Sequence, residues 1–397
     1  MSTADNERIR APIPTRELER RWAEVRKAMK AQGIDTLIMQ NDNMYLGGYV
    51  RYFLDFPAVN GYPVTVIFPK DDEMTTITHG GPPRPPRPPA WALRGVKTRL
   101  SFPYFRTAYW TNSWDAEATV KTIKDRKDKK VGIVGLGCMH AAYYKYLEQN
   151  LSGVEIVEAS DLVDRIKAVK SADEMVYVRL AAETQDMVMA AVPTVVRPGK
   201  YEYEVRTELE WMLGDLGSEE QLMKLGSAPI GTPAGTQPNH FMNHRIEWGD
   251  QVAIMIEPSG PGGYYGELNR TFVLGEPPED LIKSWADARS AQHYVASLCK
   301  PGAKPAEIFK KYNEFLTDKG YPPEGRVFAH GQGYDVVERP LIRDGEDMAL
   351  EAGMVLAVHP LLLTNYSWAF CCDDFVVTDN GGERLHRTPQ EIMTIRC

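Results

Sequence analysis

A helix-capping motif near the middle of the chain separates two parts of different character. Ser171 is followed three residues later by Glu174, and an apolar pattern with helical spacing comes after them. A serine and a glutamate at this spacing satisfy free backbone N–H groups at a helix start, so they predict a long amphipathic helix from about residue 172. We therefore place a domain boundary near this helix, with one domain over 1–166 and a second over 167–397.

The first part alternates between helix-like and strand-like segments. Residues 15–34 begin with Thr15 and Glu17 and end beside Gly33, a pattern typical of a helix. Short apolar runs predict strands at 35–40, 63–68, 73–79 and 130–135. Such alternation predicts an α/β domain. The proline-rich segment 80–91 predicts an extended polyproline path on the surface.

The second part predicts an α+β domain in which strands are largely antiparallel. Helices are expected near 202–216, 278–299 and 304–319, and strands near 221–226, 250–257, 264–274, 326–330, 354–360 and 372–378. The run from Met354 to Val358 reads as a buried strand, and His359 closes it. A buried imidazole must be hydrogen-bonded or must bind something, because leaving it unpaired costs free energy.

Composition excludes several classes of partner. The 397 residues carry a net charge of −8, which argues against nucleic acid or an anionic membrane as the main partner. No apolar run approaches the roughly 20 residues that span a bilayer, and the start of the chain shows no secretory pattern. The five cysteines form no CxxC pair, so we expect a reducing, cytoplasmic environment.

Five stretches in the second part occur in the order found in a known family. They are IKAVKSADEMVYVRLAA at the domain junction, WGDQVAIMIEP, GYYGELNRTFVLG, AHGQGYDVVERP and LEAGMVLAVHP, the last leading into CCDDFVVTDNGGERL. In this ordered set the chain resembles the pita-bread family, which includes creatinase, prolidase, Xaa-Pro aminopeptidase and methionine aminopeptidase. The first part is similar to the smaller domain of the creatinase and prolidase branch.

The resemblance implies a changed metal site. In the family's metallopeptidases two ions are held by an Asp on each of two hairpin strands, a His in an HGxG-type turn, and a Glu on each of the last two strands. The matching positions here are Met255, Glu267, His330, His359 and either Cys372 or Asp373. Hard divalent cations prefer carboxylates, and a thioether at Met255 cannot bridge two of them. The resemblance therefore argues against the usual two-metal peptidase mechanism.

Creatinase, a member of this family, works without metal and uses a His in the loop before the first hairpin strand as acid and base. The matching loop, 237–250, holds His240 and His244, and we favour His240 because it follows Pro238–Asn239 as the family His does. A neutral imidazole titrates near physiological pH and can pass a proton both ways. Creatinase grips a guanidinium with carboxylates, whose positions here read Asn269 and Cys371 or Cys372, which argues against creatine as substrate.

Strand alternation indicates which side chains share a cavity, because residues two apart on a strand face the same side. The catalytic residues expected there are His240, His330, His359 and Glu267, and the substrate-binding residues expected there are Glu257, Met255, Asn269, Tyr265 and Asp373. For His359 three interpretations stay open. It is a core histidine paired with Glu267 or Asp373, a ligand of one ion with Glu267, His330 and Asp373, or an acid/base, which we favour.

We expect an α+β pita-bread catalytic domain preceded by a smaller α/β domain, in a homodimer that acts on a small molecule. The leading hypothesis is a metal-independent, creatinase-like hydrolase or lyase that breaks a C–N or C–C bond of a small non-peptide molecule, for example releasing formaldehyde, and needs no cofactor. A substrate with an aromatic or neutral portion is favoured. The first alternative is a metal-dependent Xaa-Pro peptidase or prolidase-like enzyme with an altered mononuclear site holding Zn, Fe or Mn. The second alternative is a non-catalytic pita-bread binding module.

Overall fold

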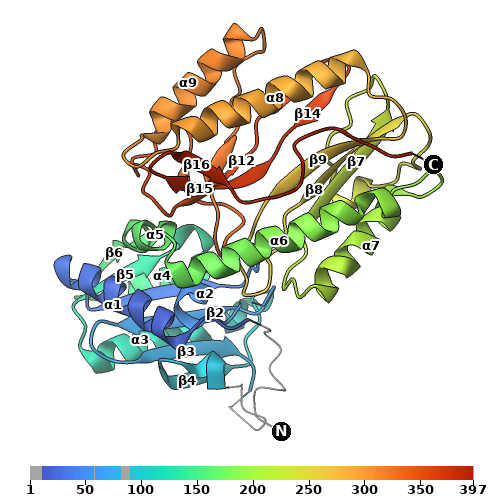
Figure 1. Ribbon diagram of the computed structural model, residues 1–397. Coiled ribbons are helices and arrows are strands. Elements are labelled where there is room, and N and C mark those ends of the chain that lie inside the picture. The colour runs from blue at the N-terminus through green and yellow to red at the C-terminus, as the bar shows by residue number, and fades with distance from the viewer. Residues whose placement is uncertain (1–10, 58, 82–89, 397) are drawn as a thin grey trace. The chain divides into compact units, whose positions relative to one another are not determined.

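The chain folds into two compact units, seen in a computed structural model that describes residues 11–57, 59–81 and 90–396 (Figure 1). The first unit ends at Lys167 and the second begins at Ala168. The central prolines of the segment expected to follow a polyproline path, residues 82–89, lie outside the described residues. In the part of the chain that the structure describes, every helix is too short or too polar to cross a membrane.

The first unit is built on one mixed six-stranded sheet in the order β4-β3-β2-β1-β5-β6. The strands are β1 (Thr36–Asn41), β2 (Val64–Pro69), β3 (Met74–His79), β4 (Val96–Phe102), β5 (Lys130–Val134) and β6 (Glu155–Glu158). The helices are α1 (Thr15–Ala31), α2 (Gly48–Leu54), α3 (Trp114–Arg126), α4 (Ala141–Asn150) and α5 (Ser160–Ala168). The α/β prediction is confirmed, although the pairs β1–β2 and β2–β3 are antiparallel.

The start of α1 differs from the sequence-based expectation of a Thr15 cap. Pro14 is the capping residue and Thr15 already lies inside the helix, without a side-chain cap. The reason is that the Pro14 carbonyl accepts the backbone N–H groups of Glu17 and Leu18, at 2.9 and 3.4 Å, so the first turn closes one residue earlier.

The second unit holds two main sheets that are covered by long helices. A four-stranded sheet, β17-β9-β8-β7, combines β7 (Met223–Pro229), β8 (Asp250–Ile256), β9 (Leu268–Val273) and β17 (Met393–Thr394). A five-stranded sheet, β11-β10-β12-β15-β16, combines β10 (Ala329–Gly331), β11 (Glu338–Leu341), β12 (Val355–Val358), β15 (Asp373–Thr378) and β16 (Gly381–Arg384). The strands β13 (Leu361–Leu363) and β14 (Trp368–Phe370) form a small hairpin.

Four helices cover these sheets in two pairs (Figure 1). They are α6 (Ala172–Val195), α7 (Glu202–Asp215), α8 (Glu279–Leu298) and α9 (Pro305–Asp318). The predicted capping box at the start of α6 is confirmed, because Ser171 Oγ accepts the Glu174 N–H at 3.1 Å and the Glu174 carboxylate accepts the Ser171 N–H at 2.8 Å. One apolar core lies between α6, α7 and the four-stranded sheet, and another between α8, α9 and the five-stranded sheet.

The two sheets of this unit meet where β9 approaches the start of β15. The Asn269 backbone N–H donates to the Cys372 carbonyl at 3.2 Å, and these residues form an isolated bridge between the sheets. Side chains on or next to β8, β9, β10, β12 and β15 therefore lie close together at this junction of the two sheets. The polar residues expected from the sequence are concentrated at this junction.

Candidate functional site

Three buried side chains, on or directly beside three different strands, form the centre of the site. Glu267 immediately precedes β9, His330 lies in β10, and His359 immediately follows β12. His330 Nε2 lies 3.4 Å from Glu267 Oε2, and His359 Nε2 lies 4.0 Å from Glu267 Oε1. One potential ligand atom from each residue falls within 4.8 Å of the others, which is close enough to hold one metal ion.

The local backbone fixes the orientation of His330. Its Nδ1 lies 3.0 Å from the Gly331 carbonyl, which can only accept, so Nδ1 carries the proton and Nε2 is directed to Glu267. A side chain at position 331 would meet the Arg339 carbonyl oxygen at 2.4 Å, so glycine is needed where β10 and β11 approach each other. Metal-binding histidines are commonly oriented by such a hydrogen bond from the other ring nitrogen.

The three residues shift one another's pKa values. Burial would raise the pKa of Glu267, but the neighbouring His359 and His330 lower it, and Glu267 in turn raises the pKa of His330 against the effect of burial. Burial lowers the pKa of His359 to about 4, so this imidazole is neutral near pH 7. Near pH 7 the centre therefore contains a neutral His359 imidazole and a Glu267 carboxylate that is paired with His330.

A buried polar atom without a partner remains at this centre. His359 Nδ1 makes no hydrogen bond to a described residue, and Glu267 Oε2 has the 3.4 Å ion-pair contact with His330 Nε2 in place of a hydrogen bond. Two imidazoles and one carboxylate, with further positions open, are the protein ligands of catalytic zinc sites and of mononuclear iron sites. The residues present therefore fit one divalent ion.

A second carboxylate lies beside the centre on the neighbouring strand. Glu257 follows the end of β8, and its Oε2 accepts a hydrogen bond from Lys224 Nζ at 3.1 Å. Burial, reinforced by the Glu267 charge, raises the pKa of Glu257 to about 7 despite the lysine. A carboxyl group with this pKa can both accept and donate a proton near neutral pH.

A row of paired residues places four side chains on one face. Lys224 pairs with Met255 across β7 and β8, Met255 pairs with Asn269 across β8 and β9, and Asn269 bridges to Cys372. Residues directly opposite each other on neighbouring strands project from the same face of a sheet. The register therefore puts Cys372, and not Asp373, on the face that Met255 and Asn269 share.

This register corrects the expected placement of Asp373 as a ligand or substrate-binding residue. Adjacent strand residues point to opposite faces, so Asp373 turns away from Glu267 and pairs with Arg270, whose Nη2 lies 2.7 Å from Asp373 Oδ1. The Cys372 thiol instead donates to the Glu267 carbonyl at 3.4 Å. The three-residue centre is thus smaller than the four-residue set expected from the sequence.

The rest of this face is apolar. Met255, Cys372 and Phe370 form a buried cluster with Leu361 and Trp368 packed against it. The Phe370 ring lies 5.6 Å from the His359 ring and 4.9 Å from the Trp368 ring. The wall beside the three-residue centre is therefore apolar, partly aromatic and uncharged.

Two other expected residues differ in burial, Tyr265 being buried and His240 exposed. Tyr265 is buried, and its backbone N–H donates to the Gly333 carbonyl at 2.7 Å, next to the turn that carries His330. His240 lies in an exposed short helical turn, Asn239–Phe241, with its ring 4.2 Å from that of Phe241. The structure does not include His240 in the buried centre.

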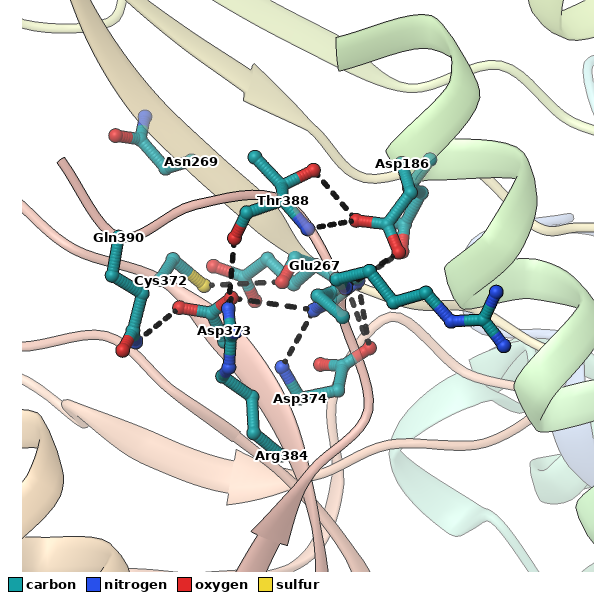
Figure 2. A network of polar contacts seen from close by, with 12 residues as sticks. Asp186, Glu267, Asn269, Cys372, Asp373, Asp374, Arg384, Thr388 and Gln390 are labelled. Atoms are coloured by element: carbon teal, nitrogen blue, oxygen red, sulfur yellow. Dashed lines mark hydrogen bonds and ion pairs between the residues drawn. The ribbon is translucent and has the colours of Figure 1, made fainter. Parts of the chain in front are cut away.

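Behind the centre, a buried polar network fixes the strands that carry it (Figure 2). Arg270 is fully buried, and Nη1 donates to the carbonyls of Asn269 and Cys372 at 2.6 and 3.0 Å while Nη2 binds Asp373. Asp373 also accepts from Gln390 at 2.9 Å and from Gln292 at 3.2 Å. One arginine therefore joins β9 to β15 at the point where the two sheets meet.

His386, as a neutral imidazole, connects this network to α6. Nε2 lies 2.8 Å from Gln185 Oε1 and donates to it, while Nδ1 accepts the Asp374 backbone N–H at 3.2 Å. Protonating Nδ1 would remove that acceptor. Burial lowers the pKa of His386 to about 4, against the opposing charge of Asp373.

Acid is expected to destabilise the fold through His386. In the unfolded chain the imidazole titrates near pH 6.5, so the unfolded state binds more protons between pH 6.5 and about 4, and the free energy of unfolding falls as the pH is lowered through that window. The loss is roughly 3 kcal/mol. Urea unfolding from pH 7 to 4 should show a shallower fall in the free energy of unfolding for His386→Gln, while the control His240→Gln, at an exposed position outside this network, should follow the unsubstituted chain. Equal slopes for all three proteins would contradict this assignment.

Sequence reasoning missed several residues of the site. Lys224 gave no signal, because a lysine on a short predicted strand is usually solvated. Arg270 did give one, since a charged residue inside an apolar strand must find a partner when it is buried. Phe370 and Trp368 lie on a hairpin that was not predicted, so their position beside His359 could not be foreseen.

Comparisons with known proteins place this architecture in a family. The model of metallopeptidase family M24 matches residues 177–379, and that of the creatinase/prolidase N-terminal domain matches residues 21–169. The curated "Probable dipeptidase PepE" of Mycobacterium tuberculosis is 28% identical over 250 residues, which is 61% of this chain and 65%, just under two thirds, of that protein. The Xaa-Pro dipeptidase of Pyrococcus horikoshii is 26% identical over 270 residues, covering 66% of this chain and 76% of that one.

A solved structure shares the fold along nearly the whole chain. The dipeptidase PepE from Mycobacterium ulcerans superposes with a TM-score of 0.75 at 23% identity, covering 97% of this chain and 100% of that one. The expected two-domain pita-bread fold is confirmed. The leading functional hypothesis, a metal-independent creatinase-like enzyme acting on a non-peptide molecule, is contradicted, because these relatives are named dipeptidases. The choice of His240 as principal base belonged to that mechanism and is withdrawn with it.

Proposed function

The chain belongs to metallopeptidase family M24, and on that premise we propose that it is a metal-dependent dipeptidase with a single-ion site. Glu267, His330 and His359 would hold the ion. The observation that carries the proposal is the convergence of these three buried side chains, with ligand atoms within 4.8 Å of one another and with His359 Nδ1 making no hydrogen bond to a described residue.

The ligand set supports one ion in place of two. Two histidines and one glutamate hold zinc in several peptidases of other folds, with a further position left open for water or substrate. Here the positions that would supply carboxylates to a second ion are Met255 and Cys372, which pack together in an apolar cluster with Phe370. A thioether is a poor ligand for a hard divalent cation. Only one half of the two-metal site is therefore supported.

The chemistry divides between the ion and the protein. A bound divalent ion supplies Lewis-acid polarisation of the substrate carbonyl and activation of a water. Glu257 is suited to take the proton from that water, because it follows Met255 by two residues and so faces the same side as Asn269 and Glu267. Lys224 Nζ donates a hydrogen bond to Oε2 of Glu257. Oε1 is therefore the oxygen that would accept the proton and return it to the leaving amine.

Metal analysis tests the proposal directly. Protein purified without added metal and analysed by atomic emission is expected to contain about one divalent ion per chain. Removing it with a chelator should abolish hydrolysis of dipeptides such as Leu-Leu and Leu-Pro, and adding back Zn²⁺, Mn²⁺ or Fe²⁺ one at a time should restore it. Two tightly bound ions per chain, or full activity after chelation, would contradict the single-ion proposal.

A further inference from the structure

Asn269 is a buried side chain with no partner for either polar atom. It is 0% exposed, and neither Nδ2 nor Oδ1 makes a hydrogen bond to a described residue. No dashed line reaches its amide in Figure 2. Its backbone, by contrast, is held on both sides, because its carbonyl accepts from Arg270 and its N–H donates to the Cys372 carbonyl. A buried polar group left unpaired by its own chain is expected to bind a ligand or water.

The residues that flank this amide are uncharged. Met255 and Cys372 lie on either side of Asn269 by strand pairing, and Phe370 completes the cluster. The nearby carboxylates on the same side have partners: Glu257 pairs with Lys224, Glu267 with two imidazoles, and Asp374 accepts the Glu267 backbone N–H at 3.1 Å.

A cation also lies next to this wall. The Arg326 guanidinium carbon lies 5.6 Å from the centre of the Phe370 ring, and Nη2 donates to the His359 carbonyl at 3.3 Å. Arg326 is itself ion-paired with Glu324, so a basic side chain placed on this face would be desolvated without gaining a partner there.

The amide offers a donor and an acceptor side by side. In an extended peptide the N–H and C=O of one residue point to the same side, and an antiparallel neighbour exchanges both hydrogen bonds with them. The side chain of Asn269 can make the same pair of bonds to one residue of a bound peptide. The apolar neighbours would then contact that residue's side chain.

We propose that the face formed by Met255, Asn269, Phe370 and Cys372 is a specificity subsite. Asn269 binds the main chain of one substrate residue, and the surrounding face selects an apolar or aromatic side chain and excludes a basic one. This inference rests on the proposed dipeptidase function and adds the class of substrate, namely dipeptides with an uncharged, apolar residue at this position.

The test compares Leu-Leu, Lys-Leu and Leu-Lys on the protein loaded with the ion that best restores activity. For the unsubstituted protein, lysine at one of the two positions should lower kcat/KM by about 10- to 100-fold relative to Leu-Leu. Asn269→Asp should reduce that discrimination at least about tenfold, because a carboxylate now pairs with the ammonium group. Asn269→Leu should instead raise KM for Leu-Leu about tenfold or more and keep the discrimination. Asn150→Asp, on α4 of the first unit, is the matched control.

The outcomes separate this inference from the proposed function. If Leu-Leu is hydrolysed but lysine is accepted equally at both positions, or if both Asn269 variants behave like the control, the subsite is wrong and the dipeptidase stands. If no dipeptide is hydrolysed, the dipeptidase proposal fails. Binding of the same three dipeptides, followed by tryptophan fluorescence, then decides the subsite alone, and binding of Leu-Leu and of the lysine peptides with equal affinity overturns it.

Discussion

Replacing Glu267 with Gln is expected to lower kcat/KM for a hydrolysed dipeptide by at least about 10³-fold and to remove the bound ion. Glu267 is the one carboxylate of the three-residue centre, and both imidazoles lie within 4.0 Å of its oxygens. A neutral amide of the same shape keeps the packing but loses the charge that attracts a divalent cation. Kinetics and metal content should therefore fall together.

The control for this experiment is a variant that loses a carboxylate charge outside the three-residue centre. Glu208→Gln removes one partner of the half-exposed pair with Lys200, whose atoms lie 2.6 Å apart, in the same unit. It should retain both the ion and the rate. A Glu267→Gln protein that still binds one ion per chain and turns over within about tenfold of the unsubstituted enzyme would show that the metal is held elsewhere.

Replacing Glu257 with Gln is expected to lower kcat by about 10²- to 10⁴-fold while leaving metal content unchanged. Glu257 lies outside the three-residue centre but follows Met255 on the strand that faces it. A neutral amide cannot take a proton from water, so the chemical step slows while substrate binding is affected less. Steady-state kinetics together with metal analysis distinguishes this pattern from that of a lost ligand.

Lys224→Met is a second variant, for which a smaller loss in kcat is expected than for Glu257→Gln. It removes the ammonium group that donates to Glu257 Oε2 at 3.1 Å without removing the carboxylate. The expected loss in kcat is smaller, about tenfold, because the base remains but is less well oriented. A Glu257→Gln protein with full kcat would mean that another group accepts the proton, and the Lys224→Met variant would then also show full kcat.

The sequence predicted the elements of the second unit well where the pattern was strong. The helix that begins after Ser171 and the apolar strand ending before His359 both lie where expected, because a capping box and an apolar run between Gly353 and Pro360 are local signals. In the first unit, the edge strands β4 and β6 were not predicted. Their residues are half exposed or charged, as in VKTRLSF, so they show no buried pattern.

The site could be predicted in part. Glu267, His330 and His359 were expected in one cavity, and the structure brings them together. The one-residue ambiguity between Cys372 and Asp373 could not be resolved from the sequence. A shift of one position reverses the face of every side chain on a strand, and only the bridge between Asn269 and Cys372 fixes it. The expected homodimer stays a prediction.

What the sequence alone determined about this protein is where the helices and strands with strong local patterns lie, and that the carboxylates of a two-metal site are replaced at Met255 and His359. These are properties of neighbouring positions and of an ordered set of motifs. The tertiary structure decided which side chains meet. Glu267 and His359 are 92 positions apart, so their contact depends on how β9 and β12 are placed at the junction of two sheets. Arg270 and Asp373 fix that junction through a buried ion pair, a long-range contact that no local pattern encodes.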